Sequence, residues 1–121
     1  MKYEGRLLNL GTVDKCNRKF AENCEIVCPD KVPVTFDFRS GLGNVLGCAE
    51  VSRDKKGLGC NVVFHHEAFT DGSYFVGGRY DHVKTYKESN ITVIDSCRLI
   101  EMSIVLAPAD ESLKIVRCEE D

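Results

Sequence analysis

Apolar and polar residues alternate along much of this chain, and a period of two predicts β-strands rather than helices. The alternation is clearest at 32–38, where the apolar residues of one face are Val34, Phe36 and Phe38. Polar residues supply the opposite face, so we expect Phe36 and Phe38 to lie in the core. An exposed docking surface is the alternative for these two rings.

The same pattern predicts seven further strands, at residues 3–10, 25–28, 45–53, 58–64, 73–80, 91–106 and 113–118. The segment Asp54-Lys55-Lys56-Gly57 is typical of a hairpin turn. Gly77 and Gly78 indicate a bulge or a close backbone approach within their strand. The remaining segments are expected to be loops at 14–24, 39–43 and 82–90, and a short helix at 65–71.

These elements predict a mainly β fold. At 121 residues the chain is expected to be a single domain over 1–121, large enough to bury a core of its own. A closed antiparallel β-barrel with one or two short helices is the most economical architecture, because closure leaves no exposed strand edge.

Charge and hydropathy exclude several classes of protein. The net charge is −3 and the longest basic run is Lys55-Lys56, which argues against a nucleic-acid-binding surface. The apolar stretches are all shorter than the roughly 18 residues that a membrane helix needs. The first residues return to polar ones at once, so we expect no secretory signal peptide and a cytoplasmic chain.

Seven cysteines are many for a chain of this length. An odd number does not make a closed disulfide framework, and the sequence holds no Cys-x-x-Cys pair. We therefore expect reduced thiols, with Cys48, Cys60 and Cys97 acting as small core residues. Neither a structural metal nor a cofactor is expected.

Four segments, taken in order, carry a resemblance to a known family: 32–38, 44–58, 71–80 and 99–109. The last is the most specific, with Leu99-Ile100-Glu101-Met102-Ser103-Ile104-Val105 followed by Pro108-Ala109. They resemble the phage prohead proteases, capsid maturation enzymes whose barrel is similar to that of the herpesvirus assemblins. The resemblance implies such a barrel and a phage or prophage context.

The residues that would carry catalysis in that family are replaced here. Phe38 stands where the resemblance places the catalytic histidine, and Val76 or Gly77 stands at the nucleophilic serine. Neither phenylalanine nor these two residues can move a proton or attack a carbonyl. We therefore expect a catalytically silent pseudoprotease that assembles with itself and with phage capsid proteins. It would act in the host cytoplasm during capsid assembly and in the virion.

Other readings of the polar residues stay open. An active serine peptidase with relocated residues would draw on Ser73, Ser103, His65, His82 and Glu101. Glu101 also matches an acidic position of the family. If its face is buried it needs a partner, for which Arg79 and Arg98 are candidates; otherwise it is solvated. A metal site is the last alternative, built from His65, His66, Glu67, Asp71 and His82.

Overall fold

The computed structural model describes residues 2–39, 44–65 and 69–118. These residues form eight strands and no α-helix. The strands are β1 (Lys2–Asn9), β2 (Arg18–Val27), β3 (Lys31–Phe36), β4 (Gly47–Asp54), β5 (Gly57–Phe64), β6 (Ser73–Glu88), β7 (Ile91–Ile104) and β8 (Lys114–Arg117).

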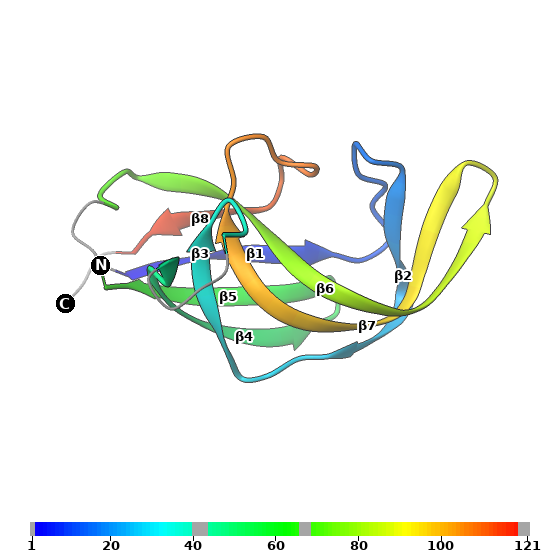
Figure 1. The fold of residues 1–121 in the computed structure, drawn as a ribbon, viewed down its shortest axis with the longest axis horizontal. Helices are drawn as coiled ribbons and strands as arrows, with labels where there is room; N and C mark the ends of the chain where they lie inside the picture. The colour runs from blue at the N-terminus through cyan, green and yellow to red at the C-terminus, as the bar shows by residue number, and fades with distance from the viewer. Residues whose placement is uncertain (1, 40–43, 66–68, 119–121) are drawn as a thin grey trace.

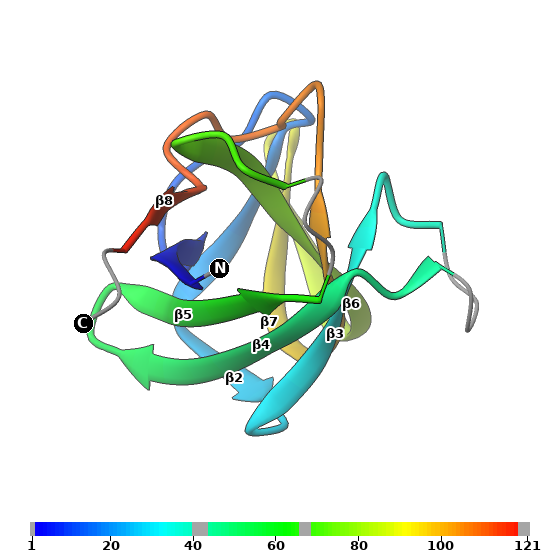
Figure 2. The same cartoon turned by 90° about the vertical axis from the view of Figure 1, so that its left-hand side faces the viewer.

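All eight strands belong to one sheet that closes on itself (Figures 1 and 2). The ring runs β7-β3-β4-β5-β1-β8-β6 and closes where β6 pairs with β7. β2 is an extra strand on β7, outside this ring. The predicted mainly β barrel is therefore confirmed.

The predicted antiparallel arrangement is wrong at two places, because the barrel is mixed. β2 and β3 both run parallel to β7 and occupy successive parts of the same edge of that strand. The other ladders are antiparallel. Side-chain alternation is the same in both kinds of ladder, so the sequence pattern carried no information about strand direction.

Two predicted loops are strands. Residues 18–24, within the segment 14–24, belong to β2, and β6 continues through 82–88 of the segment 82–90. Together with the start of β7, these residues form a projecting three-stranded unit (Figure 1). We call it the arm: residues 18–20, 82–88 and 91–96. Its β6 residues are exposed on both faces, which removes the apolar alternation.

The predicted helix at 65–71 falls partly outside the described residues, because 66–68 are not described. His65 and residues 69–71 are not helical. The predicted loop at 39–43 likewise lies, apart from Arg39, outside the described residues. In the described ranges no helix has the length and apolarity that a membrane span requires.

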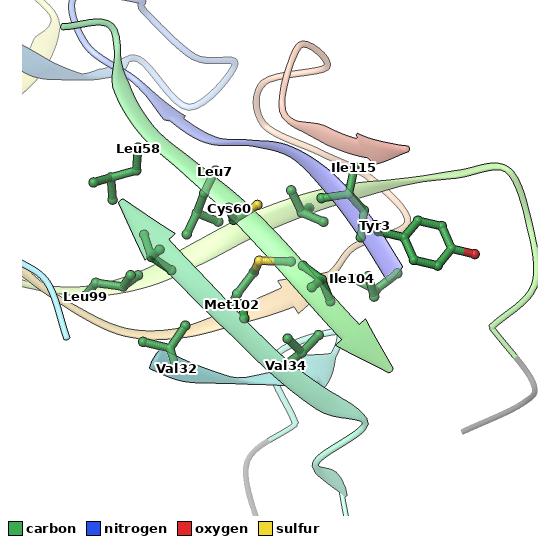
Figure 3. Close-up of a cluster of buried hydrophobic side chains, with 14 of the residues drawn as sticks. Tyr3, Leu7, Val32, Val34, Leu58, Cys60, Leu99, Met102, Ile104 and Ile115 are labelled. Carbon is green, nitrogen blue, oxygen red and sulfur yellow. The ribbon is translucent and has the colours of Figure 1, made fainter. Parts of the chain in front are cut away.

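The core fills the inside of the barrel (Figure 3). It includes Leu7, Val34, Leu58, Met102 and Ile115, all at most 1% exposed. Phe36 and Phe38 are not part of it: each is 36% exposed, so the prediction that both lie in the core is wrong. β3 places Val32 and Val34 inward, and the chain turns after Phe36.

A smaller buried cluster joins the arm to the barrel. Its members are Ala21, Cys24, Val93, Ile94 and Cys97. All seven cysteines are free thiols. Cys60 and Cys97 are buried as predicted, whereas Cys48 is half-buried.

Candidate functional site

A tight turn follows β3 and brings Phe38 against β6. Asp37 and Phe38 have φ values of 52° and 56°, and the Arg39 N–H donates to the Phe36 carbonyl at 3.1 Å. Two successive left-handed residues are typical of a type I′ turn, which is unusual for phenylalanine. Hydrogen bonds hold the strained pair: the Asp37 N–H donates to the Ile104 carbonyl at 2.8 Å.

The ring of Phe38 lies over Gly77 on the outer face of β6. A Cβ at Gly77 would lie 3.3 Å from Phe38 Cζ and 3.8 Å from a methyl of Val105. A side chain at position 77 would therefore compete with the ring for the same space. Val76 is 1% exposed and belongs to the core inside the barrel. Of the two residues that the resemblance matches to a serine, only Gly77 is next to Phe38.

Two polar side chains of β7 are buried beside this turn. Glu101 is 3% exposed and Ser103 is 0% exposed. The Ser103 hydroxyl accepts the Phe38 N–H at 2.8 Å and donates toward the Thr35 carbonyl at 3.2 Å. Thr35 Oγ1 lies 3.2 Å from Ser103 Oγ and 3.4 Å from Glu101 Oε2. The hydroxyl of Ser103 is thus occupied in holding the turn and is closed to solvent.

Arg79 reaches this network from β6. Its Nε donates to Glu101 Oε1 at 2.8 Å, directly across the β6–β7 ladder. The expectation that a buried Glu101 would pair with an arginine is confirmed for Arg79. Arg98 instead pairs with Asp81 at 3.2 Å. The carboxylate is buried, so the charge-assisted hydrogen bond from Arg79 offsets part of its desolvation.

The other candidate residues for a relocated catalytic pair lie far from one another. Ser73 is at the start of β6 and His82 is nine residues later on the same strand, so about 30 Å separates them. His65 follows β5, where its N–H donates to the Leu46 carbonyl at 2.8 Å. His66 and Glu67 lie outside the described residues. In the described ranges, no three acidic, histidine or cysteine side chains are grouped to hold a metal ion.

The imidazole of His82 is protonated less readily in this structure than that of a free histidine. Partial desolvation of the imidazole lowers its pKa below the usual 6.5, and the nearby Arg18 lowers it further, while Asp81 opposes both effects. The side chain is therefore mostly neutral at pH 7. It lies at the rim of a cleft that the sequence did not predict.

We call this the β1–β6 cleft, because it is lined by residues of β1 and β6 that lie beyond their pairing with β8. β8 pairs only with Tyr3–Gly5 of β1 and with Ser73–Phe75 of β6. Beyond that point β8 no longer lies between the two long strands, and residues of both line a cavity of about 370 Å³. Its apolar lining includes Leu7, Leu8, Val76, Ile94 and Leu113. Its polar rim includes Thr12, Asp14, Arg18 and His82.

Gly78 and Tyr80 shape one wall of the β1–β6 cleft. The tyrosine hydroxyl would lie 2.5 Å from a Cβ at position 78, so a side chain there would have to displace the Tyr80 ring. The register of β6 and β7 also shifts between Arg79 and Tyr80. The predicted bulge is present in this strand but lies one residue beyond the glycine pair, and the groups that approach Gly77 and Gly78 are the side chains of Phe38 and Tyr80 rather than another backbone. These two glycines were the sequence signal that could have located the cleft.

Chemically, the described residues on the outer face around Phe38 offer no exposed nucleophile with a proton acceptor beside it. The carboxylate of Glu101 is bound to Arg79, and the Ser103 hydroxyl is bound to the turn. What the region offers is half-exposed aromatic surface and an adjoining cleft. A scan of protein-family models gave no match to this chain, and searches of curated proteins and of solved structures gave none either.

Proposed function

We propose that this chain is a non-catalytic virion accessory or assembly protein of a phage or prophage, with a barrel similar to that of the prohead proteases. It works by binding other proteins: copies of itself and phage capsid proteins, in the host cytoplasm during assembly and in the particle. One observation carries the proposal. Phe38, matched by the resemblance to the catalytic histidine, lies against Gly77, which is one of the two residues matched to the serine.

That contact supports the resemblance, because 38 residues of intervening sequence separate the two positions and nothing in the strand pattern required them to meet. Glu101, matched to the acidic position, is in the same neighbourhood through Thr35 and Ser103. The closeness of the three positions supports the interpretation that they correspond to the family's catalytic site, with packing in place of its chemistry. A barrel that descends from a protease in this way would keep its protein-binding surface without keeping the peptidase activity.

The surface itself favours protein contacts. Phe38 and Phe75 are 36% and 39% exposed, and Leu106 is 75% exposed. Phe75 and Gly77 share the outer face of β6, since residues two apart in a strand point the same way. The Val105 N–H donates to the Phe75 carbonyl, which brings residues 105 and 106 to the same area. Large apolar side chains gathered on one outer face are typical of an interaction surface.

Among the residues that the structure describes, no observation favours the alternative of an active serine peptidase. Ser103 is buried and bonded, and Ser73 and His82 stand far apart along β6. A serine without an adjacent base is a weak nucleophile.

Two measurements test the proposal. The intact mass after incubation with a serine-directed fluorophosphonate at pH 6–9 is expected to be unchanged. A single adduct that disappears in Ser73→Ala or Ser103→Ala would overturn catalytic silence. Light scattering on the same samples gives the oligomeric state and shows whether a large assembly could hide a reactive serine from the reagent.

Co-expression with the major capsid protein of the same phage genome is expected to give co-sedimentation of the two proteins. The absence of co-sedimentation would overturn the assembly role.

A further inference from the structure

β2 is attached to the barrel through an interrupted ladder. In the sheet that the structure describes, it lies outside the closed ring and pairs with β7 alone. The pairing covers residues 18–20 and 25–27, and the register shifts between these two stretches. Residues 21–24 therefore have only Asp95 of β7 opposite them. Backbone pairing is broken in the middle of the strand, so side chains must hold β2 to β7 at this point.

Two of the side chains that do so are thiols. Cys24 and Cys97 are 1% and 0% exposed and belong to the same buried cluster. Their side chains form a hydrogen bond with each other. Cys97 pairs across the ladder with Ile26, which points to the same face of β2 as Cys24. The two sulfur atoms therefore lie next to each other beside the break in the ladder.

A positive charge accompanies this thiol pair. Arg53 of β4 donates from Nη1 to the Cys24 carbonyl at 2.8 Å. Burial raises the pKa of both thiols, and the Arg53 guanidinium opposes that rise at each of them. The thiolate is the form that attacks a disulfide, so Arg53 favours the reactive form of the pair.

We infer that Cys24 and Cys97 form a reversible disulfide that fastens β2 to β7 when the chain meets an oxidising medium. This goes beyond the proposed function and holds whether or not that proposal does. A reducing cytoplasm keeps the pair as two thiols. A low-molecular-weight disulfide such as oxidised glutathione is the oxidant.

Two thiol–disulfide exchanges form the bond. The Cys24 thiolate attacks one sulfur of oxidised glutathione, which gives a mixed disulfide and expels one glutathione thiolate. The Cys97 thiolate then attacks the Cys24 sulfur and expels the second. The two cysteines lose two electrons and two protons, which leave with two molecules of reduced glutathione.

Local opening gives the oxidant access to these buried sulfurs. β2 can separate from β7 while the seven-stranded ring stays closed, because that ring does not include β2. A disulfide at this place would suppress the same opening. Oxidation should therefore change the arm and its root more than the barrel.

The test compares the wild-type protein before and after incubation with oxidised glutathione at pH 8. Peptide mapping without reductant should find Cys24 joined to Cys97 within one chain. The bond closes a long loop of the unfolded chain, so the urea midpoint should rise by about 1–2 M and return with reductant. Hydrogen exchange should slow at 18–27 and 91–96 in the oxidised protein.

Cys24→Ala is the variant that removes one partner, and Cys28→Ala is its matched control. Cys28 is a half-buried thiol just beyond β2, and trypsin leaves it on the same peptide as Cys24, so this control also assigns the bond. Oxidation should raise the midpoint of Cys28→Ala and leave that of Cys24→Ala unchanged. If Cys24→Ala does not fold, the joined peptide in Cys28→Ala decides.

Three results would overturn the inference. They are the absence of a joined peptide, a bond that uses Cys28 in place of Cys24, and an equal rise of the midpoint in Cys24→Ala.

Discussion

The barrel and the arm contain parts of the same two strands, β6 and β7, but they are stabilised in different ways. Inside the barrel, Met102 and Ile104 of β7 lie in a core that seven strands enclose. In the arm, β6 is exposed on both faces, and a cluster of five buried residues joins β2 to β7. Backbone pairing can therefore extend a strand well beyond the core. The free energy needed to open that strand, however, depends on the buried side chains packed against it.

The largest expected effect on the free energy of unfolding comes from truncating a side chain in the barrel core. Met102→Ala removes a fully buried side chain and should lower the free energy of unfolding by about 2–5 kcal/mol. Val83→Ala in the arm, at a position 70% exposed, should change it by less than about 0.5 kcal/mol. Urea denaturation measures both. Losses of similar size would mean that the arm and the barrel share one core.

A smaller effect is expected from the polar network on the outside of the barrel. Ser103→Ala leaves the partly buried Phe38 N–H without its acceptor, which should cost about 1–3 kcal/mol. Ser52→Ala is a suitable control, because Ser52 is an exposed serine on β4. A loss no greater than that of the control would show that the turn does not depend on Ser103.

Thiol alkylation can then detect opening of the arm by itself. Burial raises the pKa of Cys97 to about 12 and that of Cys60 to about 11, so both thiols are protonated and protected at pH 8. Cys97 and Cys24 lie at the root of the arm, whereas Cys60 lies in the barrel core.

With iodoacetamide we expect exposed Cys16 to react first, then Cys24 and Cys97, and Cys60 only at the rate of global unfolding. Peptide mapping over time gives the order. Equal rates for Cys97 and Cys60 would show that the arm opens only when the barrel unfolds.

The smallest effect concerns pH at the base of the arm. The lowered pKa of His82 means that the unfolded chain binds a proton more readily than the folded one. This contribution to stability is complete above pH 6.5 and is lost as the pH falls below that value toward the folded pKa. His82→Asn should flatten that part of a stability–pH curve measured by urea denaturation. An unchanged slope would contradict the assignment.

The sequence predicted the barrel strands because their alternation is enforced by a core on one side. The strand at 91–106 and the hairpin around Asp54-Lys55-Lys56-Gly57 fall within a few residues of β7 and the β4–β5 turn. The arm was missed for the opposite reason. Where both faces of a strand are solvated, as at 82–88, polarity carries no period and resembles a loop.

For the candidate site, the arginine partner of Glu101 was predictable, whereas its contact with Thr35 and the geometry were not. An acid in an apolar frame requires a cation, and Arg79 was one of two named. The left-handed backbone of Phe38 had no sequence signal, because phenylalanine rarely adopts it. The cleft depends on where β8 ends between two longer strands, which is a property of the assembled sheet rather than of any one segment.

The parallel pairing of β2 and β3 with β7 also affects how the chain acquires its fold. Thr35 of β3 pairs with Ser103 of β7, which is 68 residues later in the sequence. The β3–β7 ladder therefore joins segments that are far apart along the chain. Contacts of such separation must overcome a large loss of chain entropy before they contribute, which slows folding. Until β7 is made, β3 has its barrel partner on one edge only. During synthesis the nascent chain therefore has an unpaired edge on β3 until β7 is translated. We expect the yield of folded protein to depend on how quickly residues 91–104 are added.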